Sequence, residues 1–517
     1  SPEIVHIDIT DAALQQVHAW PWPRRLHAEL IDLLNQLGAR TIALDIVFAE
    51  PTPPRLELPQ LSPDYDLEPE VAVRGQPSLD QAIYDDDELA EAIRRAGNVY
   101  LPVYFRLRRP PESRLQRDVA ALLRQDFSLG LEAIAQRLGQ RPALIDRILA
   151  GVKRRVADEL VRTVLQEQPQ ATIQQVHRAI LSSPFELPTA DRQDIFRAYR
   201  RQRATAQILR RSQPLPQHAH AVLPAAYELT PPLPKLLSAA RGVGFVVFEP
   251  DRDGVVRRLP LLVRYRGRLL KQLGLAVACD RLGIADRDIR VAGGKLLLRP
   301  PGRADLNVPL DATGRYLINW AGPPSHWSKV FTHIPVGRIM EIAANRRTIR
   351  QNNQQLRFDL AEMVRLFTPQ AYADYASQVR RRNQILRQLD RTPRRTADPP
   401  DRPALQAELD ALESRIARLE DNARYVLRQY YSAAQAHSPA DQQEQRLFQA
   451  AQRLYPRIIQ GQLRRQIARA NGRLQLRIDQ RMAELRPLIE GKICLVGYTA
   501  SAVADFKSTP LFENTPG

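Results

Sequence analysis

Residues 19–50 constrain the fold more than any other stretch of this 517-residue chain. Two prolines near the start of the stretch fix φ and lack an N–H, so the residues around them form a turn. A helix is expected over 24–37, because its leucines recur at every third or fourth position. Gly38 is placed to end that helix. The β-branched and apolar residues 41–48, which include Asp45, are typical of a buried strand.

Strands and helices alternate along much of the remaining chain. Strands are expected at 3–9, 98–105, 243–248, 255–264, 316–320 and 492–498, and helices at 85–97 and 268–282. Such alternation predicts an α/β fold with layers around a mixed sheet. Two long segments carry only helical spacing and are predicted to be all-α insertions. The predicted parts are therefore a scaffold in three pieces, 1–105, 217–344 and 491–517, and the insertions 106–216 and 345–490.

Several blocks of sequence, taken in order, resemble one known family. They are EIVHIDITDAAL (3–14), the turn–helix–strand stretch 19–50, NVYLPVYF (98–105), GVGFVVFEPDRDGVVRRLPLLVRYRG (242–267), RYLINWAGPP (315–324) and GKICLVGYTASAVADFKSTP (491–510). Together these blocks, which cover roughly half of the chain, resemble the CHASE type-two domain. That domain is a sensory module associated with cyclases and histidine kinases, and it lies outside the bacterial cytoplasmic membrane.

The resemblance implies the sensing half of a receptor rather than an enzyme. Members of this type are held by a transmembrane helix before the domain and by several after it. No run of about 18 apolar residues occurs in this sequence, so we expect the membrane helices to attach outside it. The resemblance also implies a homodimeric receptor with a cytoplasmic output, such as an adenylate or guanylate cyclase, a histidine or Ser/Thr kinase, or a diguanylate cyclase.

The positive charge of the chain belongs to the two insertions. The formal net charge is +18; residues 106–216 hold 21 basic and 11 acidic side chains, and residues 345–490 hold 27 and 16. Arginine supplies almost all of the basic side chains, and guanidinium groups bind carboxylates and phosphates bidentately. Anionic lipid headgroups or envelope polymers are therefore candidate partners. A GC-rich genome would produce the same composition without any role in binding.

The first insertion contains a segment that fits a helix-turn-helix template, residues 131–150. Ala135 is the small residue where the two helices cross, and Gly139 makes the turn. The apolar core of the segment is formed by Ile134, Leu138, Ile145 and Ile148. Such a unit can place a helix in the major groove of DNA, and the basic run 153–155 keeps that alternative open. A plain three-helix bundle needs the same residues, and we favour it in a module outside the cytoplasm.

The second insertion contains a short coiled-coil-like pattern. The apolar residues alternate in steps of four and three at Leu405, Leu409, Leu412, Ile416 and Leu419. A partner seam is present at Val379, Leu386 and Leu389. Prolines and charges at 390–403 favour an antiparallel hairpin over one continuous rod. Further helices are expected at 422–436 and 440–484. The hairpin is the part expected to carry dimer contacts, although the sequence does not decide between a closed hairpin and a second subunit.

No catalytic or metal-binding arrangement is recognisable, so we expect neither an enzyme nor a cofactor. The nine histidines are scattered, and the phosphate-binding and nucleophile-elbow motifs do not occur. The acidic run 251–254 lacks the third acid and the distant glutamate of a calcium loop, and its Asp-Gly ending is typical of a turn. Cys279 and Cys494 are expected to be two separate buried thiols.

The candidate ligand site lies where predicted strands end. Asp8 and Asp45 lie near the ends of two such strands, and Thr499 and Asp505 follow the closing strand. Open α/β sheets bind ligands in the crevice outside the carboxyl ends of their strands. We therefore expect these four residues to surround a pocket, and the alternative is that they cap helices and order turns. Tyr498 and Ala502 depart from the residues usual in the family, which puts the flexibility of that loop in doubt.

These observations predict an extracytoplasmic, signal-input domain of a membrane-anchored bacterial receptor, on the periplasmic face of the cytoplasmic membrane. Its ligand is expected to be an unidentified small molecule or a component of the cell envelope. The alternative is a nucleic-acid-binding protein that uses the basic insertions, and a module of this location makes that alternative the weaker one. A hydrolase has no supporting residues.

Overall fold

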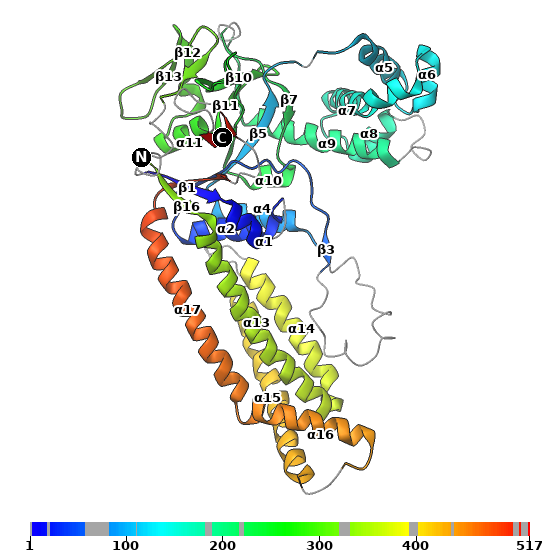
Figure 1. Cartoon of the computed structure of the whole chain (residues 1–517), viewed down its shortest axis with the longest axis vertical. Coiled ribbons are helices and arrows are strands. Elements are labelled where there is room, and N and C mark those ends of the chain that lie inside the picture. The colour runs from blue at the N-terminus through cyan, green and yellow to red at the C-terminus, as the bar shows by residue number, and fades with distance from the viewer. Residues whose placement is uncertain are drawn as a thin grey trace. The chain divides into compact units, whose positions relative to one another are not determined.

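A computed structural model of the chain shows a mixed α/β protein (Figure 1). The described residues are 3–17, 21–56, 82–109, 111–180, 189–216, 222–319, 331–391, 402–435, 439–499, 506–507 and 515–516. They form two compact units. Unit 1 takes its residues from Ser1–Thr52, Asp86–Val336 and Ile489–Gly517, and unit 2 from Pro53–Asp85 and Gly337–Leu488.

The centre of unit 1 is a seven-stranded sheet. Its strands are β1 (Ile4–Ile9), β2 (Thr41–Leu44), β5 (Val99–Arg106), β7 (Tyr227–Thr230), β8 (Gly242–Phe245), β16 (Thr332–Pro335) and β17 (Ile493–Tyr498). The spatial order is β16-β1-β17-β2-β5, and both β7 and β8 pair with β5. All of these pairs are parallel except β5 with β7. The prediction of an α/β fold with a mixed sheet is therefore confirmed.

Helices cover both faces of this sheet. On one face α11 (Leu273–Leu282) packs against Ala43 and Tyr100. The helix approaches β8 closely at Gly244, where a Cβ atom would lie 2.4 Å from the Cα of Leu273. On the other face lie α2 (Arg24–Gln36) and α4 (Asp85–Ala96) (Figure 1). Side chains alternate along a strand, so the fully buried residues on either side of Ala43 face this second layer.

Smaller sheets and short helices complete the scaffold of unit 1. The remaining strands are β6 (Gln213–Pro214), β9 (Arg258–Pro260), β10 (Leu262–Tyr265), β11 (Arg268–Lys271), β12 (Ile289–Ala292), β13 (Lys295–Leu298), β14 (Leu306–Pro309), β15 (Arg315–Leu317), β18 (Phe506–Lys507) and β19 (Thr515–Pro516). The short helices are α1 (Asp11–Val17), α10 (Pro234–Ala239) and a 3-10 turn at Asp286–Asp288. The helix predicted at 268–282 was too long, because residues 268–271 pair with β10 through a two-residue turn.

Between β5 and β6 the described residues form helices and their connections, without a strand. The helices are α5 (Arg114–Gln125), α6 (Leu131–Leu138), α7 (Pro142–Glu167), α8 (Ile173–Ile180) and α9 (Thr189–Arg210). They share one apolar core that includes Ile134, Ala135 and Ile145. Gly139 ends α6 in the left-handed conformation, with φ of 62°. The small, apolar and turn residues of the segment 131–150 thus have the places that the sequence indicated, but α7 continues to Glu167 and packs along α9.

Unit 2 is built from long helices. They are α13 (Val336–Phe367), α14 (Pro369–Arg391), α15 (Arg402–Ala434), α16 (Gln442–Leu454) and α17 (Gln462–Ile489), with a π-helical turn at Tyr455–Ile459; the short strands β3 (Arg55–Leu56) and β4 (Ala82–Ile83) also belong to this unit. The helix boundary predicted near 420 was wrong, because no proline or glycine interrupts α15 after Pro403. The single helix predicted at 440–484 is divided around Pro456 and Gly461, which remove an N–H donor and add a positive φ.

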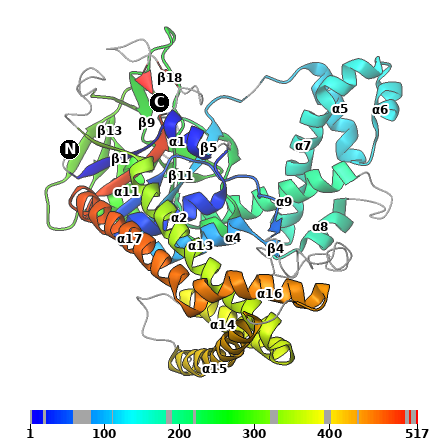
Figure 2. The same cartoon turned by 60° about the horizontal axis from the view of Figure 1, so that its bottom comes forward.

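Helices α14 and α15 pack against each other in opposite directions. Arg381 donates to Glu408 at 2.7 Å, and the Tyr375 hydroxyl donates to Glu420 at 3.2 Å. The apolar side chains between them are Ile385, Leu386, Leu389, Leu405, Leu409 and Leu412. Ile385 is fully buried and was absent from the predicted seam. Figure 2 views the same helices from below.

Candidate functional site

Asp8 and Asp45 lie on one face of the central sheet, near the carboxyl ends of two parallel strands that are separated by β17. Asp8 is in register with Gly497 on β17. Asp45 directly follows β2, and its N–H donates to the carbonyl of Val496 at 2.8 Å. A Cβ atom on Gly497 would lie 3.7 Å from the Cβ of Asp45. Because neighbouring strands are about 4.8 Å apart, the two carboxylate-bearing positions are separated by roughly 10 Å, with only a glycine between them.

Asp8 has a partner that the sequence did not indicate. The carboxylate of Asp8 lies 3.0 Å from Nδ1 of His333 on β16. The ring of His333 stacks on that of His6, with centroids 4.6 Å apart. Burial and the neighbouring His333 lower the pKa of His6. The face therefore carries a small polar cluster of two imidazoles and one carboxylate beside the glycine gap.

Strand β16 explains why His333 was missed. The strand is only four residues long and ends in Pro335, which is tolerated because β16 is an edge strand of the sheet. Neither its length nor its pattern distinguishes it from a loop in the sequence. The one available signal was the alternation of His6 and Asp8 with buried residues on β1, which places both on one face.

Of the other two predicted site residues, Thr499 lies within the described part of the chain and Asp505 does not. The N–H of Thr499 donates to the carbonyl of Ile9 at 3.1 Å, so Thr499 continues the pairing of β17 with β1. Asp505 lies outside the described residues, as does Ala502. Tyr498 is in register with Ile9 and therefore points to the face opposite Asp8. Burial raises the pKa of Tyr498.

No metal centre is present in the parts of the chain that the structure describes. Within them, no three His, Cys, Asp or Glu side chains are placed to hold a metal ion together. The acidic run 251–254 forms a turn, in which Gly254 has φ of 80° and donates to the carbonyl of Asp251. The carboxylate of Asp251 is held by Arg257 and Arg258 at 3.4 and 3.2 Å. Cys279 and Cys494 are separate, buried thiols.

The tryptophan–proline turn before α2 has a packing role. Trp22 and Phe48 contact the ring of His27, with centroids 5.8 and 5.2 Å away. His27 is 1% exposed. Burial lowers its pKa to about 3, so its imidazole is neutral at physiological pH. The guanidinium group of Arg24 lies over the Phe48 ring, 4.4 Å from its centroid, and pairs with Asp86.

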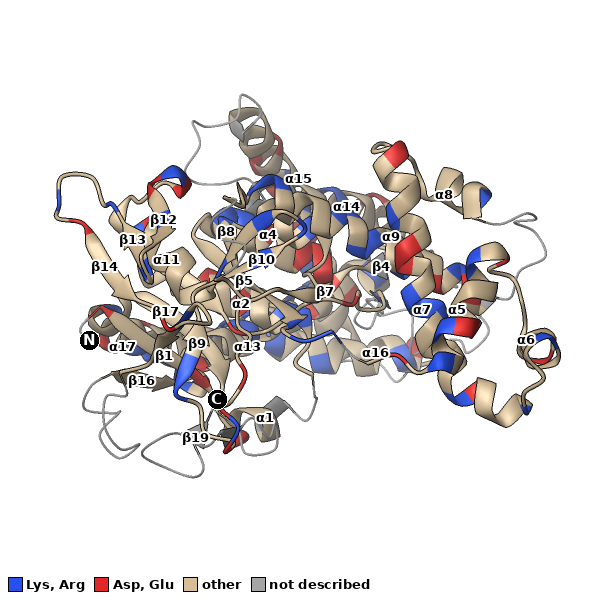
Figure 3. Ribbon diagram, turned by 90° about the horizontal axis from the view of Figure 1, so that it is seen from above, with Lys and Arg blue, Asp and Glu red and all other residues tan. Residues whose placement is uncertain are grey.

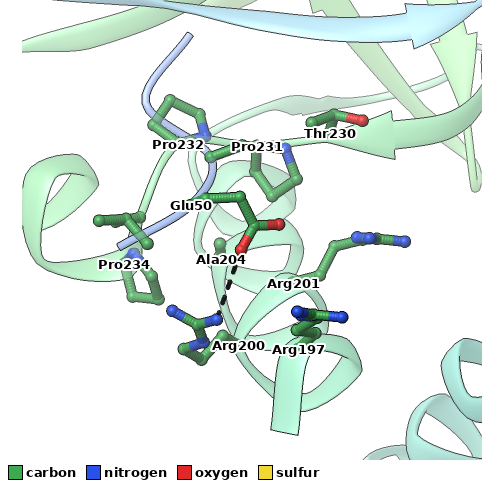
Figure 4. Close-up of a pocket in the computed structure, with 11 residues that line it drawn as sticks. Glu50, Arg197, Arg200, Arg201, Ala204, Thr230, Pro231, Pro232 and Pro234 are labelled. Atoms are coloured by element: carbon green, nitrogen blue, oxygen red, sulfur yellow. Dashed lines mark ion pairs between the residues drawn. The ribbon is translucent and has the colours of Figure 1, made fainter. Parts of the chain in front are cut away.

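A small pocket lies between α9 and the loop that follows β2 (Figure 4). Glu50 points between Arg197, Arg200 and Arg201, and its carboxylate is 3.7 Å from Arg200. Another side is closed by Pro231, Pro232 and Pro234. The free volume is about 30 Å³, which is room for about one or two water molecules. This pocket is therefore an arginine cluster neutralised by acidic side chains of the same chain rather than a site for an organic ligand.

The basic run that suggested nucleic-acid binding is used within the fold. Lys153 pairs with Asp191 at 2.7 Å, and its side chain is only 12% exposed. Arg155 pairs with Glu112 at 3.2 Å. Arg154 donates to the carbonyl one turn earlier in its own helix. Figure 3 shows basic and acidic residues interspersed along α5, α7 and α9, so the helix-turn-helix segment presents no uniform positive face for a phosphate backbone.

Comparison with known proteins identifies the family. The model of the CHASE2 domain matches residues 1–358, about two thirds of the chain. No curated protein and no solved structure matches the chain. The match ends within α13, yet the sheet is completed by β17 at residues 493–498.

CHASE2 domains are sensory, non-catalytic domains of signalling receptors. None of the helices in the described part of the chain combines the length and the apolarity that a bilayer crossing requires. The matched range contains β1, β2, β5, β7, β8 and β16, and thus every strand of the central sheet except β17. This chain belongs to the CHASE2 domain family.

Proposed function

We propose that this chain is the signal-input domain of a membrane-bound bacterial receptor, on the extracytoplasmic face of the cytoplasmic membrane. Family membership supports the proposal, because CHASE2 domains are extracellular sensory domains of membrane receptors. Flanking transmembrane helices join the domain to a cytoplasmic output, which is a cyclase, a kinase or a diguanylate cyclase. The receptor functions as a homodimer, and the hairpin of α14 and α15 supplies dimer contacts.

The position of β1 is the single observation that best supports a sensing role. β1 carries Asp8 and lies between β16 and β17. α13 begins directly after β16, and α17 ends four residues before β17. The two chain connections that join the long helices of unit 2 to unit 1 therefore leave from the two strands that flank β1. A ligand that binds at these strand ends and favours one spacing of the strands biases the positions of both connections.

The proposed ligand site is the glycine gap between Asp8 and Asp45. Two carboxylates about 10 Å apart suit a ligand with a cationic or hydroxyl group between them. Thermal-shift measurements with calcium, magnesium and spermidine test this site directly, because a ligand of the folded state raises the midpoint by mass action. We expect Asp45→Asn to abolish such a shift, and Asp305→Asn, which removes a carboxylate paired with Arg299 far along the chain, to retain it.

The location of the domain is testable with one engineered cysteine. Both native thiols are buried, and burial raises their pKa to about 11 and about 12, so they do not react with a maleimide. Leu306 on β14 is 42% exposed. In the full-length receptor we expect Leu306→Cys to react with a membrane-impermeant maleimide in intact cells. Reaction only after the cells are permeabilised would contradict an extracytoplasmic location, and the unmodified receptor measures the background.

A further inference from the structure

A second cavity in unit 1 has a strongly basic lining. It lies between α7, α9 and the turn that joins β10 to β11, and α7 and α9 run side by side in both views of Figures 1 and 3. Its volume is about 460 Å³, within the usual range for small-molecule sites. The charged residues that line it are Arg162, Arg203, Arg210 and Arg266, and no aspartate or glutamate is among the lining residues.

None of these four arginines forms an ion pair with a carboxylate in the part of the chain that the structure describes, although the charge of Asp158 acts on Arg266. Arg203 donates to the carbonyl of Pro169 at 2.7 Å, and Arg266 donates to the Gln202 side chain at 3.0 Å. Both partners are uncharged. Within the described ranges, no ion pair joins Arg162 or Arg210 to a carboxylate. Four like charges around one cavity repel each other, and an anion bound among them relieves that repulsion.

Among the described half-buried lysine and arginine side chains of this helical segment, only Arg162 and Arg203 lack an acidic partner, and both line this cavity. Elsewhere in the same helical segment, basic side chains are paired with carboxylates: Lys153 with Asp191, Arg155 with Glu112, Arg124 with Glu159 and Arg201 with Asp158. Exposed arginines without an ion pair also occur on the described surface of the segment, for example Arg137, Arg141 and Arg147. The cavity differs from those positions because its arginines surround one hollow and two of them are half-buried.

Arg266 occupies an unusual backbone conformation. It is the first residue of the two-residue turn between β10 and β11, with φ of 48°, and Gly267 follows with φ of 73°. Turns of this kind favour Asn-Gly, because both central residues need positive φ. An arginine is strained in this conformation relative to glycine, because its Cβ comes close to the backbone. The turn nevertheless presents a guanidinium group to the cavity, where an asparagine would suit the backbone better.

The rest of the lining indicates what kind of anion fits. Leu165, Ala206 and Leu209 supply apolar surface. The side-chain oxygen of Gln207 is buried and has no hydrogen-bond partner, and a buried acceptor of this kind calls for a donor. An inorganic ion has neither an apolar body nor a donor directed away from its charge. A compact organic molecule that carries both anionic groups and a hydroxyl or amino group satisfies the whole lining.

We propose that this cavity binds a small organic anion with two or more phosphate or carboxylate groups, held by Arg162, Arg203, Arg210 and Arg266. Planar guanidinium groups bind both kinds of oxyanion bidentately. The idea that this ligand is the input signal of a receptor rests on the proposed function, whereas its binding to the cavity does not. The site is separate from Asp8 and Asp45, which would repel such a ligand.

Calorimetric titration of the whole chain with citrate, ADP and pyrophosphate tests the proposal. We expect citrate or ADP to bind with a Kd below about 1 mM in 150 mM salt, and pyrophosphate, which lacks the organic body, to bind at least tenfold more weakly. No heat with any of the three probes up to 10 mM would overturn the proposal, and so would equal affinity for ADP and for sulfate at the same ionic strength.

The variant Arg266→Asn separates loss of binding from loss of folding. Asparagine suits the turn, so the thermal midpoint of the free protein stays unchanged or rises, while affinity for the probe falls at least tenfold. Arg137→Gln is the matched control, because it removes one exposed positive charge from α6 without touching the cavity. Equal weakening by the two variants would show a general charge effect and contradict the assignment of the cavity.

Vesicles that contain anionic lipids distinguish a free metabolite from a lipid headgroup as the source of the anionic groups. A free ligand predicts that ADP or citrate binds in the absence of any vesicle and that Arg266→Asn does not change sedimentation with vesicles. Loss of sedimentation in Arg266→Asn would identify a headgroup as the occupant, and retention of sedimentation with no binding of soluble probes would contradict the proposal. These outcomes do not depend on where the domain lies, so failure here leaves the receptor proposal intact.

Discussion

The arginines on two faces of α9 differ in whether they pair with a carboxylate. One face carries Arg197, Arg200 and Arg201, and each of them pairs with a carboxylate, those of Asp194, Glu50 and Asp158 respectively. The opposite face carries Arg203 and Arg210, spaced by two helical turns, and neither has an acidic partner among the described residues. The helix is the same, and so is the type of side chain.

The difference shows that the role of an arginine on a helix depends on the side chains that face it from neighbouring elements. On the paired face, acidic residues of the loop after β2 and of α7 reach the guanidinium groups, and the pocket there is nearly filled. On the other face, glutamines and aliphatic side chains take the places where acids would neutralise the charge, and a cavity remains. A pair stabilises the fold, whereas an unpaired cluster is available to a ligand.

The largest effect on stability is expected at the pair of Arg201 and Asp158. Arg201→Ala leaves the Asp158 side chain, which is only 22% exposed, without its guanidinium partner. Removing one member of a partly buried pair strands the other charge, so we expect the free energy of unfolding to fall by about 1–2 kcal/mol in urea titrations. Arg210→Ala on the opposite face serves as the control, and a loss of similar size there would remove the contrast between the two faces.

A second test uses the pKa of Asp158. Burial raises this pKa, despite the nearby Arg201. A carboxyl with a raised pKa in the folded state stabilises the fold at low pH, and this contribution is lost as the pH rises through the folded-state pKa. Asp158→Asn does not titrate. Relative to the parent chain, the variant should therefore gain stability between pH 4 and pH 7, by at most about 1.4 kcal/mol per pH unit. Urea unfolding at pH 4 and pH 7 measures the free energy of unfolding of both proteins. A difference between them that does not change with pH would show that burial does not raise the pKa of Asp158.

A smaller effect is expected at Glu50. Its side chain is 65% exposed and lies 3.7 Å from Arg200, so solvent screens the pair. Glu50→Gln should change the free energy of unfolding by less than about 0.5 kcal/mol. A loss as large as that of Arg201→Ala would mean that the arginine cluster in the small pocket depends on this one carboxylate.

The smallest effect concerns the unpaired face itself. Arg210→Gln removes one of four like charges without breaking an ion pair, so stability should stay within about 0.5 kcal/mol of the parent. Any change should be a gain at low salt that disappears in 0.5 M NaCl, because salt screens the repulsion between exposed guanidinium groups. Thermal denaturation at the two salt concentrations checks this, and a loss at low salt would reveal an acidic partner of Arg210.

The sequence was sufficient for β1, β2, β5, β8 and β17 of the central sheet and for the placement of Asp8 and Asp45 near strand ends. Both follow from local information, because buried strands have a distinct composition and the carboxyl ends of parallel strands lie at one edge. That the two carboxylates share a face of the sheet was a hypothesis that the register of β1 and β17 now supports. Thr499 lies at the same edge, and Asp505 remains a prediction.

Tertiary contacts account for what the sequence did not provide. His333 lies on a four-residue edge strand, and its proximity to Asp8 depends on a pairing across more than three hundred residues. The basic cavity joins positions on α7, α9 and a hairpin turn, and no local pattern relates these three elements. Only the positive φ of Arg266 leaves a trace in the sequence, as an Arg-Gly pair where Asn-Gly is usual.

The place of β17 at the centre of the sheet sets an order of events during synthesis. β1 and β2 leave the ribosome early, but the strand that separates them follows some 450 residues later, after the helices of unit 2. Until then the nascent chain holds unpaired strand edges, which are prone to wrong pairing. Closing so long a loop costs only slightly more entropy than closing a short one. The inserted helical unit therefore lowers the equilibrium stability of the sheet only a little. Its main effect is on synthesis, because the growing chain needs protection from aggregation until β17 has been made.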